Sequence, residues 1–131
     1  MKTSLVTIND DSSIFEAAKL LAAKNVGSLL VRNKENKIYG ILTDEDLVRR
    51  ALAKDNLKAK ISDIASKPLI GLTPDADLSE AARMMGAKRV KRLVVFKEKS
   101  SAEPVGIISE TDIVRISPSL YDLIAARERI S

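Results

Sequence analysis

The sequence contains no histidine, no cysteine and no tryptophan, and aromatic residues occupy only 3% of its 131 positions. Without His and Cys the chain cannot form the usual zinc sites, a Cys nucleophile or a Ser-His-Asp triad. Acid–base chemistry would fall to Asp, Glu, Lys or Tyr, a smaller set than most enzymes use. These absences argue against an enzyme, and the few aromatics leave little for stacking on single-stranded nucleic acid.

The sequence also lacks long hydrophobic runs. No apolar stretch approaches the roughly 20 residues that cross a bilayer, and the first residues lack the apolar region of a secretory signal. The content of 45% hydrophobic and 31% charged residues is typical of a globular domain. We therefore expect a cytoplasmic protein without a membrane partner.

Positive charge is only slightly in excess over negative charge. Lys and Arg number 22 against 18 Asp and Glu, which gives a net charge of +4 and a pI of about 9.4. This balance permits anionic ligands or nucleic acid, but it favours a solvated surface of mixed charge for most of these residues.

The clearest positive feature is a motif that occurs twice, as Gly40-Ile-Leu-Thr-Asp-Glu-Asp46 and Gly106-Ile-Ile-Ser-Glu-Thr-Asp112. Each copy continues into an aliphatic-Val-Arg stretch that is typical of a helix. One copy would be weak, because a hydroxyl residue followed three positions later by an acid also marks a helix N-terminus. Two copies inside a longer repeat carry more weight.

The repeat extends beyond the motif. Four residues recur 64 positions later in the same or a similar form: Ile14 as Leu78, Glu16 as Glu80, Ala17 as Ala81 and Val26 as Val90. Gly40 and Gly106 are 66 positions apart, so the second copy gains two residues in a turn. Each copy is roughly 60 residues long, which is marginal for an independent core.

Within each copy the pattern predicts strand, helix, strand, strand and helix. In the first copy the strands are 5–8, 26–32 and 37–42, and the helices begin at Ser13 and Thr43. We expect Ala18 and Val48 to lie on the buried faces of these helices, and Ile61 and Ile64 to form a short helical linker. The second copy repeats the order, and 119–130 is an additional amphipathic helix.

The sequence thus predicts an α+β (α/β) fold. Two β-α-β-β-α repeats, residues 1–62 and 63–117, would pack about a pseudo-two-fold axis, with a C-terminal helix at 118–131.

This layout resembles a tandem pair of cystathionine β-synthase (CBS) domains, often called a Bateman module. The resemblance covers roughly 5–116 and rests on the two motifs and on the stretch Ile61-Ser-Asp-Ile-Ala-Ser-Lys-Pro-Leu-Ile-Gly-Leu-Thr-Pro-Asp-Ala76. It implies a non-catalytic regulatory module that binds adenosine-containing ligands (AMP, ADP, ATP or S-adenosylmethionine) in two clefts between the repeats. An adenine nucleotide would be a regulatory ligand and no cofactor would be obligatory. The resemblance further implies a homodimer and a separate effector protein.

Carried over by position, the resemblance assigns residues to each cleft. An ionised Asp would accept hydrogen bonds from the ribose hydroxyls, and the Thr or Ser hydroxyl would bond the ribose or α-phosphate. The first cleft would use Ile41, Thr43, Glu45 and Asp46, with Leu69, Ile70, Lys91 and Arg92 from the second repeat. The second cleft would use Ile107, Ser109, Thr111 and Asp112, with Leu5, Val6, Val26, Gly27 and Ser28 from the first repeat.

The two clefts are expected to be unequal. Lys91 and Arg92 correspond to Gly27 and Ser28, 64 positions earlier. Only the first cleft therefore receives a cationic pair, and we expect it to prefer ligands with phosphates.

Three alternatives remain open at this stage. The hydroxyl and acidic residues of the motif could simply cap helices. The basic cluster 88–92, with Arg127 and Arg129, could bind nucleic acid, although no reading motif is evident. Asp44, Glu45 and Asp46 could bind magnesium, but successive helical residues point in different directions.

Overall fold

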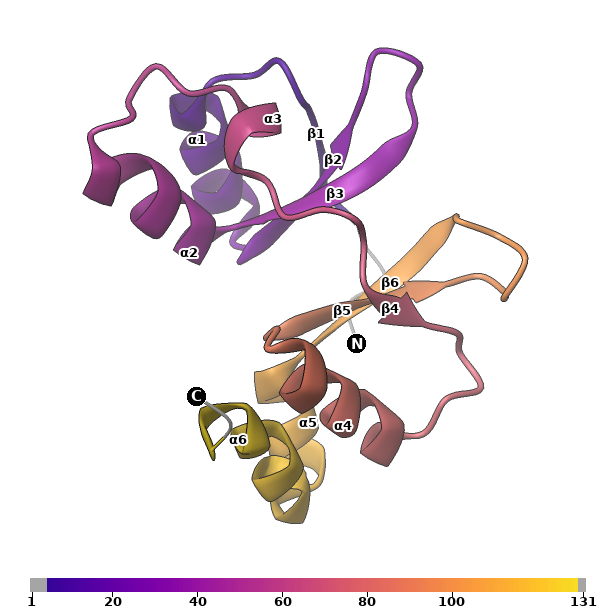
Figure 1. The fold of residues 1–131 in the computed structure, drawn as a ribbon. Coiled ribbons are helices and arrows are strands. Elements are labelled where there is room, and N and C mark those ends of the chain that lie inside the picture. Colours follow the sequence, from indigo (N-terminus) through magenta and orange to yellow (C-terminus); the bar gives the residue numbers. More distant parts are fainter. Residues whose placement is uncertain (1–4, 130–131) are drawn as a thin grey trace. The chain divides into compact units, whose positions relative to one another are not determined.

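The computed structural model describes residues 5–129 of the chain, and the side chains of residues 5–126. The chain divides into two compact units, Leu5–Leu69 and the part that begins at Ile70 (Figure 1). Each unit contains a three-stranded sheet and its own helices.

The first unit follows the predicted order of elements. Its strands are β1 (Thr7–Asn9), β2 (Ser28–Arg32) and β3 (Ile38–Thr43), and its first helix is α1 (Ile14–Lys24). The second helical segment comprises α2 (Asp44–Asp46), a π turn η1 (Leu47–Ala51) and a 3₁₀ turn η2 (Leu52–Lys54), and α3 (Ile61–Ile64) follows. In the sheet β1 and β2 are parallel, whereas β2 and β3 form an antiparallel hairpin.

The second unit repeats this arrangement. It contains β4 (Gly71–Leu72), α4 (Leu78–Lys88), β5 (Arg92–Phe96), β6 (Pro104–Ser109) and α5 (Glu110–Ile116). A 3₁₀ turn η3 (Pro118–Leu120) then leads to α6 (Tyr121–Arg129). The sheet has the order β4-β5-β6, again with one parallel and one antiparallel pair. The predicted fold class, two β-α-β-β-α repeats with an added C-terminal helix, is confirmed.

Strand register confirms where the extra residues lie. Thr7 pairs with Leu30 and Gly71 with Val94, so the parallel pairs correspond at an offset of 64 residues. In the hairpins, Ser28 pairs with Thr43 and Arg92 with Ser109, an offset of 64 on one strand and 66 on the other. The two additional residues therefore lie in the second hairpin loop, 97–103, which corresponds to 33–37 in the first.

The first helix of each repeat is defined by the predicted caps. Ser13 forms a capping box with Glu16, and the side chain of Asp77 accepts a hydrogen bond from the Glu80 N–H at 2.8 Å. The residues that follow the helices, Asn25 and Arg89, are both in the left-handed conformation that terminates a helix. Matching start and stop signals thus give two helices of 11 residues each.

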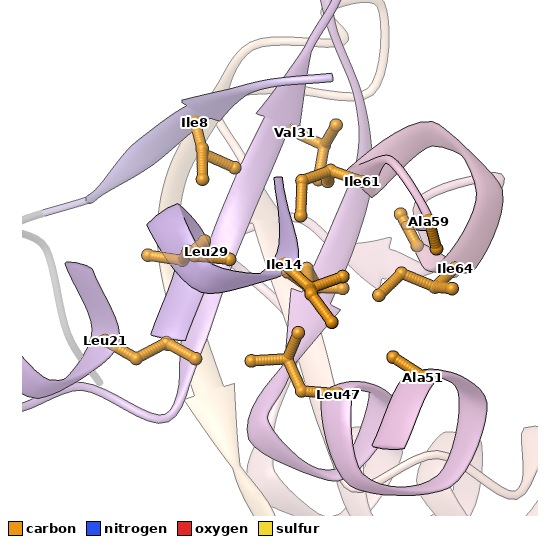
Figure 2. Close-up of a cluster of buried hydrophobic side chains, with 13 residues drawn as sticks. Ile8, Ile14, Leu21, Leu29, Val31, Leu47, Ala51, Ala59, Ile61 and Ile64 are labelled. Atoms are coloured by element: carbon orange, nitrogen blue, oxygen red, sulfur yellow. The ribbon is translucent and has the colours of Figure 1, made fainter. Parts of the chain in front are cut away.

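The core of the first unit lies between its sheet and its helices (Figure 2). Alternate side chains of β2, Leu29 and Val31, pack with Ile14 of α1 and with Leu47 of η1. Ile61 and Ile64 of α3 complete this core with exposures of 0% and 2%. The expected short helix is present, but it is part of the core rather than only a linker.

Residues 61–67 are also bonded through the backbone to the rest of the first unit. Ile41 and Ser66 exchange two hydrogen bonds, at 3.0 and 2.9 Å, and the Ile61 N–H donates to the Ser12 carbonyl at 3.1 Å. The first compact unit accordingly extends to Leu69. The repeat boundary between residues 62 and 63 stays a prediction.

The second unit completes its core with α6 instead. Ile124 of α6 is fully buried and packs with Met85 of α4 and Ile113 of α5. The two helices approach closely at Gly86, where an added Cβ would lie 2.3 Å from the carbonyl oxygen of Leu123. Glycine at this helical position is therefore required by packing.

Two expected core residues are exposed. Ala18 of α1 is exposed, and Val48 has 55% of its surface accessible. Each directly follows a buried residue, Ala17 or Leu47, and one helical step of about 100° turns the side chain out of the core. The apolar faces are thus narrower than the sequence pattern indicated.

Candidate functional site

The repeated motif forms the same local structure in both repeats. Thr43 ends β3, its hydroxyl accepts a hydrogen bond from the Asp46 N–H at 3.1 Å, and its own N–H donates to Oδ2 of Asp46 at 2.9 Å. Ser109 and Asp112 make the equivalent pair of bonds at 3.1 and 3.0 Å. These four residues therefore cap their helices, and their role in ligand binding stays a prediction. The cap uses one oxygen of each carboxylate.

The hairpin brings further predicted site residues next to each motif. In the first repeat Ser28 lies opposite Thr43, and the Gly27 carbonyl accepts a hydrogen bond from the Asp44 N–H at 3.1 Å. In the second repeat Arg92 lies opposite Ser109, and the Lys91 carbonyl accepts from the Glu110 N–H at 2.8 Å. The hydroxyl residue of each motif and the residue after it thus lie beside the residue pair that the sequence analysis assigned to the other cleft.

The remaining predicted residues precede or flank the same strands. The carbonyl of Val6 accepts from the Leu30 N–H at 2.9 Å, and that of Ile70 accepts from the Val94 N–H at 3.0 Å. The first unit contains Leu5, Val6, Val26, Gly27, Ser28, Ile41, Thr43, Glu45, Asp46 and Leu69. The second unit contains Ile70, Lys91, Arg92, Ile107, Ser109, Thr111 and Asp112. The assignment of these residues to two shared clefts stays a prediction.

The two motif carboxylates differ in their second oxygen. The side chain of Asp46 is 13% exposed, and its Oδ1 lies 3.7 Å from Nε of Arg50. Nη1 of Arg50 also donates to the carbonyl of Ile64 in α3 at 3.2 Å. Sequence analysis did not identify Arg50. Its spacing of four residues from Asp46 was a signal for an ion pair, but its bond to Ile64 depends on tertiary structure.

Asp112 is ionised at neutral pH. Burial acts to raise the pKa of its carboxyl, but the hydrogen bonds from the Ser109 backbone and hydroxyl, together with the charge of Arg115, hold the pKa below its ordinary value of 3.8. A carboxylate in this state is an acceptor only, so it suits hydroxyl or N–H donors.

The acidic run at the start of α2 does not assemble a metal site. Asp44 Oδ1 accepts a hydrogen bond from the Glu45 N–H at 2.8 Å, Glu45 pairs with Arg49 at 3.0 Å, and Asp46 bonds Thr43. Among the residues that the structure describes, no three acidic side chains are close enough to hold a metal ion. The same part of the chain contains no helix that is long and apolar enough to cross a membrane.

Comparison with known proteins identifies the repeats. The CBS domain family matches residues 1–53 and 61–119. Protein MJ1225 of Methanocaldococcus jannaschii is 31% identical over 116 residues, which are 88% of this chain and 40% of that protein. The chain spans 40–67% of the length of the first four curated relatives it matches.

Solved structures show the same architecture. The CBS domain pair of protein MJ0100, in complex with 5′-methylthioadenosine and S-adenosyl-L-methionine, has a TM-score of 0.78 and 26% identity and covers 91% of this chain and 92% of its own. A hexameric CBS-CP12 protein from bloom-forming cyanobacteria has a TM-score of 0.77 and 30% identity, covering 87% of this chain and 63% of its own. Since the family matches two segments that follow the two structural repeats, this chain belongs to the CBS domain family and carries two CBS domains in tandem.

Proposed function

We propose that this CBS domain pair is a regulatory module that binds an adenosine-containing ligand and signals its presence to a separate effector protein. The observation that carries the proposal is the repeated carboxylate. Asp46 and Asp112 are each fixed through Oδ2, which leaves Oδ1 as the oxygen that can accept ribose hydroxyls. The ligand complex of the MJ0100 domain pair supports the choice of adenosyl compounds.

The ligand acts by binding one conformation of the module more tightly than another. It shifts the population by no more than this difference in affinity. We propose no catalytic role for the module itself, because its sequence contains no His or Cys to act as base or nucleophile. The effector protein responds to this shift in the conformation of the module.

Thermal unfolding of the full chain with AMP, ADP, ATP, S-adenosylmethionine and 5′-methylthioadenosine tests the proposal. A ligand at 100 times its Kd stabilises the folded state by about 2.7 kcal/mol. We expect at least one of the five to raise the melting temperature, and the double variant Asp46→Asn with Asp112→Asn to remove the effect. GMP is the control for base selectivity. Unchanged melting with all five compounds would refute the function.

The phosphate preference follows from the basic residues at the start of β5. We assign Lys91 and Arg92 to the ligand of Asp46, although Arg92 also lies opposite Ser109 in its own hairpin. Losing one cation–phosphate contact weakens AMP binding by roughly ten- to hundredfold. Calorimetry of Arg92→Ala, once in an Asp112→Asn background and once in an Asp46→Asn background, identifies which carboxylate shares its ligand with Arg92. A loss confined to the second background would contradict the assignment.

Homodimer formation is a further part of the proposal. Val48 and Leu52, four residues apart on the second helical segment of the first repeat, are 55% and 53% exposed. A helix with two neighbouring exposed aliphatic residues suits a second copy of the chain, and assembly is known for the hexameric CBS-CP12 protein. Light scattering should give a dimer for the wild type and a monomer for Val48→Asp with Leu52→Asp.

Nucleic-acid binding is the alternative function. Lys88 and Arg89 at the end of α4, and Lys91 beyond it, are exposed, whereas the side chains of Arg127 and Arg129 lie outside the described residues. A gel shift that weakens steeply with salt would favour this alternative, because each phosphate contact releases counterions.

A further inference from the structure

The two motif carboxylates start from identical geometry. In each repeat Oδ2 accepts the backbone N–H of the capping residue, at 2.9 Å in Asp46 and 3.0 Å in Asp112. This bond fixes the plane and position of the carboxylate. Because Oδ2 is bonded in the same way in both repeats, a difference between the two carboxylates as acceptors of a ribose hydroxyl is expected at Oδ1.

In the first repeat a cation is held beside Oδ1. Nε of Arg50 lies 3.7 Å from this oxygen, and Nη1 is bonded at 3.2 Å to the carbonyl of Ile64. Ile64 is 2% exposed and belongs to α3, which is fixed in the core of the unit. The guanidinium therefore remains near Asp46, even though its own side chain is 49% exposed.

The second repeat has a hydrocarbon at the equivalent position. The offset of 66 residues that relates Thr43 to Ser109 relates Arg50 to Ile116, which is 64% exposed. Among the side chains of residues 5–126, no Lys or Arg forms an ion pair with Asp112. Arg115 acts on Asp112 only through its charge, from beyond ion-pair distance.

We infer that Arg50 is a specificity-determining residue that makes Asp46 a poorer acceptor for ribose hydroxyls than Asp112. This inference rests on the proposed adenosine-binding function and deepens it. A carboxylate oxygen that faces a fixed cation offers less negative charge to a hydroxyl and leaves less room for it. Asp112 thus selects for the ribose, while the ligand of Asp46 is held more by its other groups.

The test compares AMP with 2′-deoxy-AMP by calorimetry on the full chain. In an Asp46→Asn background only Asp112 remains as a sugar acceptor, and in an Asp112→Asn background only Asp46 remains. We expect the ratio of Kd for 2′-deoxy-AMP to Kd for AMP to be about tenfold larger at Asp112, the size of one hydrogen bond to a charged acceptor.

Two substitutions test whether the residue at position 50 or 116 causes the difference in the Kd ratio between Asp46 and Asp112. In the Asp112→Asn background, Arg50→Gln removes the charge and is expected to raise the ratio at Asp46 severalfold, whereas Arg50→Lys keeps the ratio low. In the Asp46→Asn background, Ile116→Arg lowers the ratio at Asp112. The controls are Lys54→Gln, which removes a positive charge from the same helical segment as Arg50, and Ile116→Gln, which removes apolar surface without adding charge. Neither control should change its ratio.

The possible outcomes distinguish failure of the inference about Arg50 from failure of the proposed adenosine-binding function. If none of the five adenosyl compounds binds, or if both Asp→Asn changes leave affinity unaltered, both proposals fail. If one of the other compounds binds but AMP does not, the ratio is measured with that compound and its 2′-deoxy form. If the carboxylates are required but the two ratios are equal, or unaffected by Arg50→Gln and Ile116→Arg, the role of Arg50 alone is overturned. Because Ile116 is exposed, Ile116→Arg tests the inference even if Arg50→Gln weakens the fold.

Discussion

The two repeats share their strand register and their caps, but each completes its core with a different additional segment. The first uses α3, whose Ile61 and Ile64 are buried, and the second uses α6, whose Ile124 is buried. A repeat of roughly 60 residues buries too little apolar surface to be comfortably stable alone. The sheet and two helices of each repeat therefore leave part of the core open, and α3 in the first unit and α6 in the second supply the rest of the apolar contact.

Several positions that differ between the repeats are those that touch these segments. Arg50 bonds Ile64 and corresponds to Ile116, while Gly86 lies against α6 and corresponds to exposed Ala22. Tyr39 lies under the Lys67 ammonium, which is 5.8 Å from the ring centroid, and corresponds to Val105. The repeats thus differ at positions where each one meets its own additional segment, whereas the Gly, the hydroxyl residue and the final Asp of the motif are kept in both.

The largest effect is expected from Ile124→Ala in α6. Truncating a fully buried Ile leaves a cavity between α4, α5 and α6 and should lower the free energy of unfolding by about 3 kcal/mol. Urea denaturation of the full chain measures the change. Phe15→Ala, at a position 54% exposed, is the control and should stay within about 0.5 kcal/mol. A similarly small loss for Ile124→Ala would mean that the second repeat does not depend on α6.

A smaller effect is expected from exchanging the residues at positions 86 and 22. Gly86→Ala places a Cβ 2.3 Å from the Leu123 carbonyl oxygen, so α6 must shift, at a cost of about 2 kcal/mol. Ala22→Gly loses only helix propensity, about 1 kcal/mol. Propensity alone predicts that Gly86→Ala stabilises the protein, so the sign of its effect in thermal unfolding decides whether α6 packs on α4 as described.

Sequence patterns predicted what local chemistry determines. Ser13 with Glu16, Asp77 with Glu80 and the two hairpins are defined by neighbouring residues, and their predicted caps and strands are confirmed. The capping role of the motif was also foreseen, since a hydroxyl followed by an acid three residues later has that meaning in any sequence.

The features that could not be predicted from the sequence depend on contacts between residues far apart in the chain. The place of α3 in the core could not be read from its 4 residues, because periodicity needs a longer window. The bond between Arg50 and Ile64 joins residues 14 positions apart. The close packing at Gly86 could have been predicted, because a glycine inside a helical pattern often marks close packing.

The third prediction compares the caps themselves. Thr43→Ala and Ser109→Ala each remove an N-cap and should each lower the free energy of unfolding by about 1 kcal/mol.

Acidic pH provides a further test of the cap in the second repeat. Because the pKa of Asp112 is below its ordinary value of 3.8, largely through Ser109, its contribution to stability is present above that pH and is lost as the pH falls through the folded-state pKa. The stability gap between wild type and Asp112→Asn should therefore narrow below pH 3.8. A gap that stays constant would contradict the cap.

The smallest effect should come from the contact between Tyr39 and Asp10 in the first repeat. The Tyr39 hydroxyl donates to Oδ2 of Asp10 at 2.9 Å, and this partly exposed hydrogen bond is worth about 0.5 kcal/mol. Burial, followed by the hydrogen bond and charge of Asp10, raises the pKa of Tyr39 from 10.0 to about 12. The folded state then holds this proton more tightly than the unfolded state does, so the contribution is present below pH 10 and is lost as the pH rises towards 12.

Tyr39→Phe should therefore cost little at neutral pH and make the loss of stability between pH 10 and 12 shallower. Denaturation curves across that range measure it, and Tyr121→Phe in the second repeat, where the ring is 46% exposed, is the control that should keep the wild-type slope. The expectation is specific to the first repeat, because the position that corresponds to Tyr39 in the second is Val105, which has no proton to lose. If both variants gave the wild-type slope, the hydroxyl would not be bound to Asp10 in solution.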